Sequence, residues 1–418
     1  MTNDFQLHDI RRYIAHSDLE EFATPYPESV EGEARQVAEK THYYRNAFSR
    51  DRDRIVHCRS FRKLQNKTQV FVSGLNPSVR NRLTHTIEVW QLSVTMARSL
   101  GANIDLTEAI AFGHDLGHTP FGHSGEISLG KQLEKMDFGG FNHNEQSVIV
   151  CSFLEESPKK ITSSEDSNIG LNLTRASLEG ILKHTTRYER GVYDKRLNSF
   201  GFNASNGSIE AQIVHIADDI AQKTHDLHDL YNVNIIKDIW IYRILKDYSS
   251  FFGEGDESDL IEKFSNDGLT KDMISHLVTR LVDDVLDTSL KNLNDEFTGD
   301  PTNKRFINYS SDVGKFVKEL ENITNTEGIN SDEVNQMNAR GRNIINSLYA
   351  LFVKDPYCMP RLYKGKFSNG IKEKVKQEDI RKMEDVEIKE EKDVRVICDY
   401  IASLTDNEAI DRFHSLLA

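Results

Sequence analysis

The chain has 418 residues, 8 prolines and a formal net charge of −14. This length allows two average domains or one large domain with an appendage, and either would bury a substantial core. The net negative charge argues against a general nucleic-acid coat and against a polybasic membrane binder, because both need an excess of cations. An anionic substrate is still compatible with it, since the stretch 50–82 holds nine lysines and arginines against two aspartates.

The cellular location is predicted from cysteine usage and from the lack of targeting signals. The four cysteines are far apart and do not show the paired spacing of a metal site, which favours a reducing compartment. The first residues form neither a basic start nor an apolar core, and no apolar run approaches the ~20 residues that span a bilayer. We expect a cytoplasmic protein that contacts no membrane and does not have nucleic acid as its main ligand.

The residue pattern predicts an all-α fold in three parts. Leu, Ile, Glu and Lys are abundant, and no segment alternates strongly between apolar and polar residues. Residues 1–45 are polar and mixed, and we expect an N-terminal arm that orders against a partner subunit. Residues 46–235 would form the core, and residues 236–418 a C-terminal helical region packed on that core.

The first strongly periodic segment predicts a helix over residues 82–100, with His85 in its first turn. Two rows of apolar residues could face the core of the protein. One row contains Leu83, Ile87, Trp90 and Val94, and the other contains Val89, Leu92 and Met96.

The next predicted helix begins at a capping-box pattern, Asp105-Leu-Thr-Glu108. Gly117 is the expected C-terminal cap of this helix. His114 and Asp115 would then lie in its last turn, where the backbone direction is fixed and the side chains can face a cleft.

A third helix is predicted over residues 208–230, with a core face of isoleucines at 209, 213, 216 and 220. Asp218 lies in the apolar context Val-His-Ile-Ala-Asp-Asp-Ile-Ala, where an unpaired carboxylate is costly. A metal ion would remove this cost, and so would a salt bridge to an arginine.

The segment Gly113–Glu126 is the most informative part of the chain, because it holds three histidines, an aspartate and a glutamate in fourteen residues. Its His114-Asp115 pair offers a metal one nitrogen and one oxygen, and His85 and Asp218 would complete a set of four ligands. Such a mixed set with open positions suits Mn, Fe, Co or Ni better than an all-oxygen Mg site, and it suits hydrolysis. Taken singly, each of these residues is more often a buried, paired side chain with a structural role than a metal ligand.

The order His85, His114-Asp115, Asp218 resembles the metal-binding pattern of the HD superfamily of phosphohydrolases. Further segments resemble the dNTP triphosphohydrolase (dGTPase-like) family within it. These are residues 52–57, 61–71, 81–89, 141–147, 210–214, 217–221, 225–227 and 399–406. The resemblance is dense from about residue 45 to 230 and sparse from there to about 395.

This resemblance implies a helical HD core and the hydrolysis of a deoxynucleoside triphosphate to deoxynucleoside and intact triphosphate. The cofactor would be a divalent metal ion, Mn or Mg in the first place and otherwise Fe, Co or Ni. By the same resemblance, His123 and Glu126 form a catalytic pair that delivers a proton to the leaving 5′ oxygen. Glu126 could also be only a favourable charge in the first turn of the next helix.

Substrate contacts are also implied by the family pattern. A triphosphate carries about four negative charges, so several cations should converge on it. The candidate substrate-binding residues are Arg82, His118, His143, Arg62, Lys63, Gln65, Asp226 and Gln222. The chain departs from the family at Gln222, where a tyrosine is common, and at Ser403 and Asn407, where glycine and arginine are common.

Two further readings stay open at the sequence level. Another HD phosphohydrolase, such as a 5′-nucleotidase, would release phosphate stepwise, and a catalytically inactive module would only sense nucleotides. The family resemblance also implies a homo-oligomer and a second dNTP acting as an activator. The preferred base, the number of subunits and the native metal are not predicted by the sequence.

Overall fold

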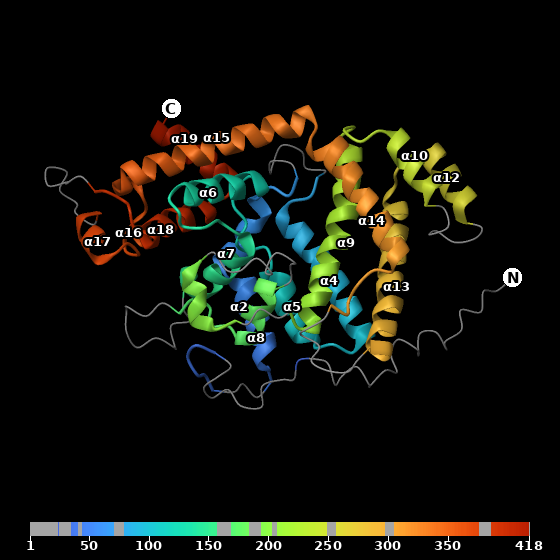
Figure 1. The fold of residues 1–418 in the computed structure, drawn as a ribbon, viewed down its shortest axis with the longest axis horizontal. Helices are drawn as coiled ribbons and strands as arrows, with labels where there is room; N and C mark the ends of the chain where they lie inside the picture. The colour runs from blue at the N-terminus through green and yellow to red at the C-terminus, as the bar shows by residue number, and fades with distance from the viewer. Residues whose placement is uncertain are drawn as a thin grey trace.

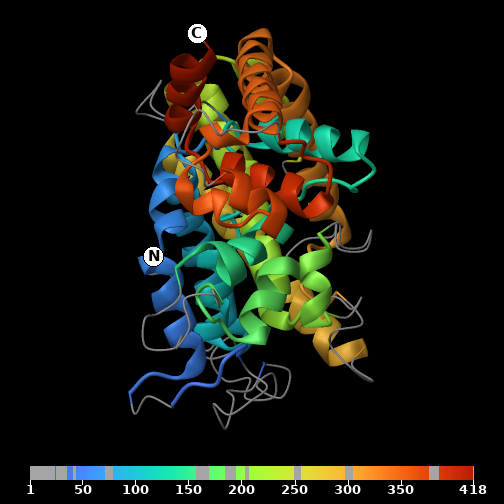
Figure 2. The same ribbon diagram turned by 90° about the vertical axis from the view of Figure 1, so that its left-hand side faces the viewer.

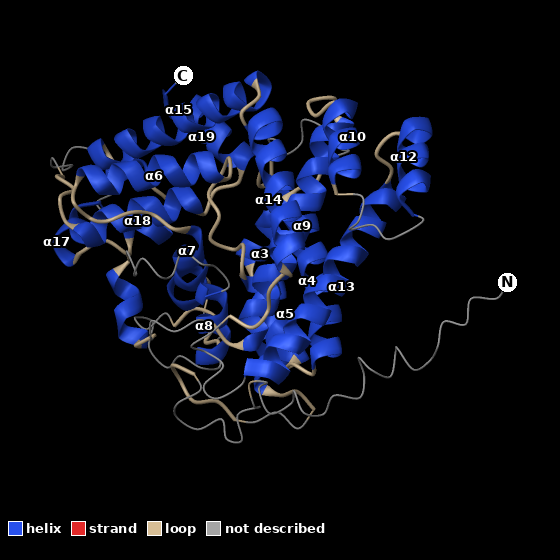
Figure 3. Cartoon of the chain, turned by 45° about the vertical axis from the view of Figure 1, so that its right-hand side comes forward, coloured by secondary structure: helices blue, strands red, loops and turns tan. Residues whose placement is uncertain are grey.

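The computed structural model describes residues 24, 35–40, 44–70, 79–156, 169–183, 194–202, 207–248, 256–296, 305–375 and 386–417. Within these ranges the chain is helical, and the only β pairs are the isolated bridges Arg35–Thr174 and Thr68–Asn81. Figure 3 accordingly draws helices and loops but no strands in the described part. The predicted all-α fold is confirmed.

The helices of the first half of the chain surround the segment singled out above. Their bounds are α2 (Ala47–His57), α3 (Arg59–Lys63), η2 (Leu64–Asn66), α4 (Arg82–Leu100), α5 (Ile104–Gly113), α6 (His123–Lys135), α7 (His143–Ile149), η3 (Val150–Leu154), α8 (Arg175–Lys183), η5 (Lys195–Phe200) and α9 (Ile209–Asn232). 

The second half adds a further group of helices. Their bounds are α10 (Asp238–Asp247), α12 (Asp256–Asp267), α13 (Lys271–Glu296), α14 (Ser311–Ile323), η7 (Thr324–Ile329), α15 (Asp332–Lys354), η8 (Pro356–Cys358), α16 (Arg361–Lys364), α17 (Asn369–Val375), α18 (Glu391–Ala402) and α19 (Asp406–Leu417). None of the described helices is both long enough and apolar enough to cross a membrane.

Helices α4, α5 and α9 pack against one another at the centre of the fold (Figure 1). The isoleucine face predicted for α9 is confirmed, because Ile209, Ile213, Ile216 and Ile220 are all buried. On α4 both predicted rows contribute core positions, because Val89 and Met96 of the second row and Val94 of the first are buried, while Ile87 of the first row is exposed. The buried face of α4 therefore also carries His85, one turn before Val89.

The C-terminal helices lie over the same centre rather than apart from it. In Figures 1 and 2, α15 runs along α6, with α18 and α19 beside it. One hydrophobic cluster joins Phe121 and Leu129 to Ile344, Leu348 and residues of α18. Another cluster runs from α4 and α9 into α13 and α14. Hydrophobic contacts thus cross residue 235, and the predicted three-part division at 45 and 235 stays a prediction.

The start and end of α5 differ from the sequence expectation. The N-cap is Asn103, whose side chain accepts the N–H of Leu106, so the capping box at Asp105 is not the helix start. The helix ends at Gly113, and Gly117 does not adopt the left-handed conformation of a C-terminal cap. Gly117 is instead required by close packing, because a Cβ there would lie 2.2 Å from the carbonyl oxygen of His143 and from the N–H nitrogen of Ser147.

Candidate active site

The four predicted metal ligands come from the three central helices and from the turn that follows α5. His85 lies in the first turn of α4, which begins at a capping box formed by Asn81 and Thr84. His114 and Asp115 follow the last residue of α5, and Asp218 lies midway along α9. The mutual packing of α4, α5 and α9 therefore brings together residues that are far apart in the sequence.

The ligand atoms of His85, His114 and Asp115 lie together, and Asp218 lies against the two histidines. Nε2 of His85 lies 2.9 Å from Oδ1 of Asp218, and Nε2 of His114 lies 3.8 Å from the same oxygen. Nε2 of His114 is 3.5 Å from Oδ1 of Asp115. In an octahedral site with bonds of about 2.1 Å, adjacent ligands are about 3 Å apart. The distances and the mixed nitrogen and oxygen donors therefore fit a single divalent ion of the kind that imidazole and carboxylate bind together.

The tautomer of His114 and the ionisation of Asp218 also suit a metal. Nδ1 of His114 donates to the backbone carbonyl of Ala111 at 2.7 Å, which makes Nε2 the acceptor nitrogen that faces the carboxylates. Burial raises the pKa of Asp218, but its hydrogen bond from His85 and the charge of His114 outweigh burial, and the pKa falls below its ordinary value. Burial lowers the pKa of His85, and Asp218 reverses that shift and raises it. The carboxylate is thus held in its ionised, metal-binding form.

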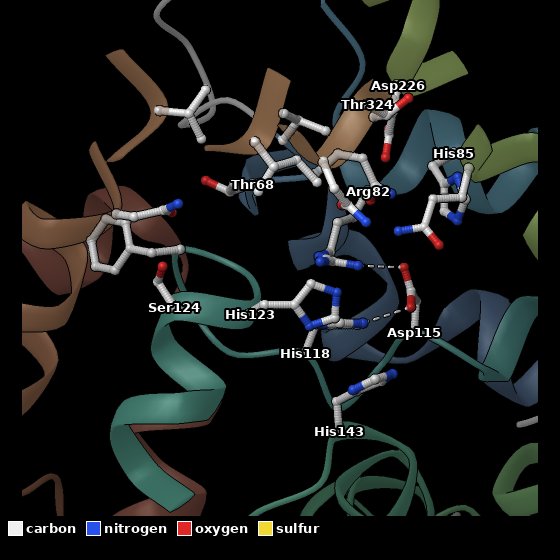
Figure 4. Close-up of a pocket in the computed structure, with 18 of the residues that line it drawn as sticks. Thr68, Arg82, His85, Asp115, His118, His123, Ser124, His143, Asp226 and Thr324 are labelled. Atoms are coloured by element: carbon white, nitrogen blue, oxygen red, sulfur yellow. Dashed lines mark hydrogen bonds and ion pairs between the residues drawn. The ribbon is translucent and has the colours of Figure 1, made fainter. Parts of the chain in front are cut away.

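Asp115 also organises the neighbouring cationic and histidine side chains. Its Oδ2 accepts Nη1 of Arg82 at 2.8 Å, and its Oδ1 lies 3.0 Å from Nε2 of His118 (Figure 4). Burial opposes ionisation of Asp115, but His118, His114 and Arg82 hold its pKa well below the usual range. Burial, together with the charges of Arg82 and His143, holds the pKa of His118 well below its usual value, so His118 is neutral at physiological pH.

Three histidines and one glutamate form a second cluster beside the first. Oε2 of Glu126 accepts Nδ1 of His123 at 3.1 Å, and Oε1 accepts Nδ1 and the backbone N–H of His143 at 3.0 and 3.1 Å. The ring of His143 stacks on that of His118 at 3.8 Å. Burial raises the pKa of Glu126, but His143 and His123 outweigh it and hold the pKa well below normal. The side chain of His123 is 54% exposed and lines the cavity described below, whereas Glu126 is buried.

The turn between His118 and His123 is held from two sides. Phe121 and Gly122 both have positive φ angles, of 60° and 56°, which reverse the chain before α6 begins at His123. The ammonium group of buried Lys67 donates to the backbone carbonyl of His118 and, at 2.9 Å, to that of Ala402. The C-terminal part of the chain thereby fixes the turn that carries these histidines.

Both clusters open into one cavity of about 640 Å³. Figure 4 shows His118, His123 and His143 on one side of it and His85 and Asp226 on the other. Of the predicted site residues, those that line the cavity are Arg82, His85, Asp115, His118, His123, His143, Asp218, Gln222 and Asp226. His114 and Glu126 are buried in contact with this set. Burial raises the pKa of Asp226 to about 7.

Three predicted substrate residues are not brought into this cavity. Arg62 and Lys63 line a second cavity of about 820 Å³, next to Tyr363 and Arg412. The ammonium group of Lys63 donates to the carbonyl of Ser403 at 2.7 Å and to Glu408 at 2.6 Å. Gln65 is exposed and does not line either cavity.

The basic stretch 50–82 is largely neutralised within the molecule. Arg50 and Arg54 both pair with Glu39, Arg52 pairs with Glu108, and Arg80 pairs with Glu88 and Asp229. Arg82 is the arginine of this stretch that reaches the first cavity.

Comparison with known proteins identifies two domains in the chain. An HD domain matches residues 82–223, and a phosphohydrolase-associated domain matches residues 307–415. The chain is 34% identical over 388 residues to a deoxyguanosinetriphosphate triphosphohydrolase-like protein of Wolinella succinogenes, with 89% of this chain and 96% of the relative covered. Like-named proteins of Geobacter metallireducens (34%, 96% of this chain and 95% of the relative) and Leptospira interrogans (32%, 97% and 100%) match as fully.

The chain belongs to the deoxyguanosinetriphosphate triphosphohydrolase-like family of HD-domain proteins.

Membership in this family indicates that the chain is a phosphohydrolase. Its cluster of His and Asp side chains could hold a divalent metal. The matched HD domain contains all four predicted ligands and the His123–Glu126 pair.

The phosphohydrolase-associated domain supplies the opposite wall of the cavity, which sequence reasoning did not find. Its lining residues are Glu321, Thr324, Asn325, Ile329, Asn330, Val334, Asn335, Asn338 and Arg342. No motif in this region signals a site, because polar residues on an amphipathic helix are typical of a solvated face.

Proposed function

We propose that the chain hydrolyses deoxynucleoside triphosphates, in a metal-dependent reaction, to deoxynucleoside and intact triphosphate. One observation carries the proposal: the four proposed metal ligands and the His123–Glu126 pair lie at or directly behind the wall of one cavity of about 640 Å³. The names of the relatives described above support the same reaction class.

A divalent metal held by His85, His114, Asp115 and Asp218 would supply a Lewis acid that polarises the α-phosphate and activates water near neutral pH. The chain's own residues supply the proton. Because Nδ1 of His123 donates to Glu126, the opposite ring nitrogen is the one that can hand a proton to substrate. As water adds to the α-phosphorus and loses a proton to solvent, the bond to the 5′ oxygen breaks, its electron pair stays on that oxygen, and protonated His123 gives it a proton.

Phosphate and sugar contacts are proposed for those predicted residues that line the cavity. Arg82 is oriented by Asp115, so this wall offers a fixed guanidinium donor to phosphate oxygens, and His118 lies beside it, stacked on His143. Asp226 and Gln222 lie on the α9 side and are proposed to contact the deoxyribose. We further propose that the protein is cytoplasmic and homo-oligomeric and that a second dNTP activates it, each on the strength of the family resemblance.

The test is to incubate metal-stripped protein with each of the four dNTPs, alone and in mixtures, with Mn or Mg restored. Nucleosides and inorganic phosphates are then separated and quantified by chromatography. Intact triphosphate in equal amount to deoxynucleoside is expected, with no turnover before metal is restored. Orthophosphate or pyrophosphate as the product would favour a 5′-nucleotidase-like reaction instead. Nucleotide binding without turnover at any metal would favour a sensing module.

A further inference from the structure

The first half of α15 lines the cavity with one face. Val334, Asn338 and Arg342 line the cavity at intervals of four residues, and Asn335 lies three residues before Asn338, which places them on the same side of the helix. This face lies opposite the HD-domain wall that carries the histidines. The phosphohydrolase-associated domain thus presents a row of polar side chains to whatever occupies the cavity.

The position of Arg342 along this face is fixed by tight packing of its neighbour. Gly341 is buried so closely against Phe121 that a Cβ on Gly341 would lie 2.7 Å from the Cβ of Phe121. Farther along, Gln132 of α6 donates to Asn346 of α15 at 2.8 Å. The backbone of Arg342 is therefore fixed next to the turn that leads into His123, because it belongs to a packed helix and not to a loop.

The charges that line the cavity single out Arg342. Arg82 is paired with Asp115 at 2.8 Å, and Lys223 lies 3.1 Å from Glu321 and 3.6 Å from Asp219. Arg342 is the third cation of the lining, and among the described residues it has no ion-pair or hydrogen-bond partner. A half-buried guanidinium without a carboxylate keeps its full charge available for a ligand.

We propose that Arg342 binds the terminal phosphates of the substrate, and so makes the phosphohydrolase-associated domain part of the triphosphate site. The inference rests on the proposed function, because it takes the bound nucleotide to be a triphosphate. The guanidinium offers paired donors that match phosphate oxygens. Arg82 and Lys223 are already paired with carboxylates, so they offset only part of the negative charge of a triphosphate, and Arg342 offsets more of it. A contact to the outer phosphates does not touch the bond that breaks, so Arg342 strengthens binding rather than the chemical step.

The test compares Arg342→Gln and Arg342→Lys with Arg340→Gln. Arg340 is an exposed arginine on the same helix that does not line the cavity, so it is a control for charge. Calorimetry with inorganic tripolyphosphate, in excess Mg on both sides, measures binding of the phosphate chain alone. A deoxynucleoside monophosphate, which lacks the two outer phosphates, is titrated in parallel. Thermal melting checks that each variant is folded.

Arg342→Gln is expected to weaken tripolyphosphate binding about tenfold, the size of one charge-assisted hydrogen bond, and to leave monophosphate binding within about twofold. KM should rise by a similar factor for all four dNTPs with kcat nearly unchanged. Arg342→Lys should keep part of the affinity, and Arg340→Gln should match the wild type.

An unchanged tripolyphosphate Kd in Arg342→Gln, or a KM increase confined to one base, would overturn the inference. Arg342-dependent tripolyphosphate binding in a protein that hydrolyses no dNTP would refute the proposed function but support this site.

Discussion

Asp406, the first residue of α19, accepts the backbone N–H of Phe121 at 2.9 Å through Oδ1. Its second oxygen accepts the hydroxyl of Thr68 at 2.5 Å. Phe121 is the residue of positive φ at which the chain turns from His118 toward His123. A carboxylate near the C-terminus therefore holds the turn that orients the proposed catalytic histidines.

Asp406→Ala should disturb this turn. We expect the free energy of unfolding to fall by about 2 kcal/mol, because the Phe121 N–H loses a buried acceptor, and kcat/KM to fall about 100-fold through misplaced histidines. Asp406→Asn should be milder, since its amide oxygen can still accept from Phe121 and its NH₂ group can donate to Thr68. Denaturant unfolding and steady-state kinetics measure both effects. Wild-type kcat/KM in Asp406→Ala would show that the turn does not depend on this contact.

Removal of the proposed acid should stop chemistry and spare the metal. His123→Ala should lower kcat by about 10² to 10⁴, because the leaving 5′ oxygen loses its proton donor. Metal bound per chain, measured by mass spectrometry, should stay at the wild-type level, since His123 is not among the four proposed ligands. His414→Ala, which removes an exposed histidine of α19, is the matched control. Full turnover by His123→Ala would remove this residue from the mechanism.

The stability of the metal-free protein should depend on pH through Asp226. Burial raises the pKa of this carboxyl to about 7, so the folded state keeps a proton that the unfolded chain releases near pH 4. The folded protein binds more protons in this window, and its stability therefore falls as pH rises from about 4 to 7. Asp226→Asn should remove this loss, which is about 4 kcal/mol at most. The Tm gain of the variant over wild type should thus be larger at pH 8 than at pH 5; an equal gain at both would contradict the raised pKa.

Two buried glycines should respond in opposite ways to alanine. A Cβ at Gly117 would lie 2.2 Å from backbone atoms of α7, which cannot move aside as a side-chain tip can. Gly117→Ala should therefore destabilise the protein by several kcal/mol, about 3 or more, and reduce metal binding by shifting the neighbouring Asp115. At Gly130, inside α6, the nearest atom to a new Cβ is 3.6 Å away. Gly130→Ala should stabilise by about 0.5 to 1 kcal/mol. Urea unfolding of both variants gives the comparison, and equal stabilities would refute the packing argument.

Much of the proposed metal site was predictable because each ligand lies on, or directly after, a helix that is legible in the sequence. Helical periodicity indicated α4 and α9, and the order of His85, the His114-Asp115 pair and Asp218 resembled a known family pattern. Periodicity could not choose between the two apolar rows of α4, since both have helical spacing. Only packing against α5 and α9 decided that the buried face takes Val89 and Met96 from one row and Val94 from the other, and that His85 faces inward with them.

The opposite wall of the cavity could not be predicted in the same way. Asn338 and Arg342 belong to an amphipathic helix whose polar residues look like an ordinary solvated face. Likewise, Arg62 and Lys63 form a basic pair in the sequence, yet the structure turns them to a second cavity. By itself the sequence determined the helical class, the ligand types and their order, because these follow from local spacing and side-chain chemistry. The tertiary structure decided which cations reach the cavity and which form ion pairs with carboxylates elsewhere in the protein, because ion pairing depends on contacts between helices distant in the chain.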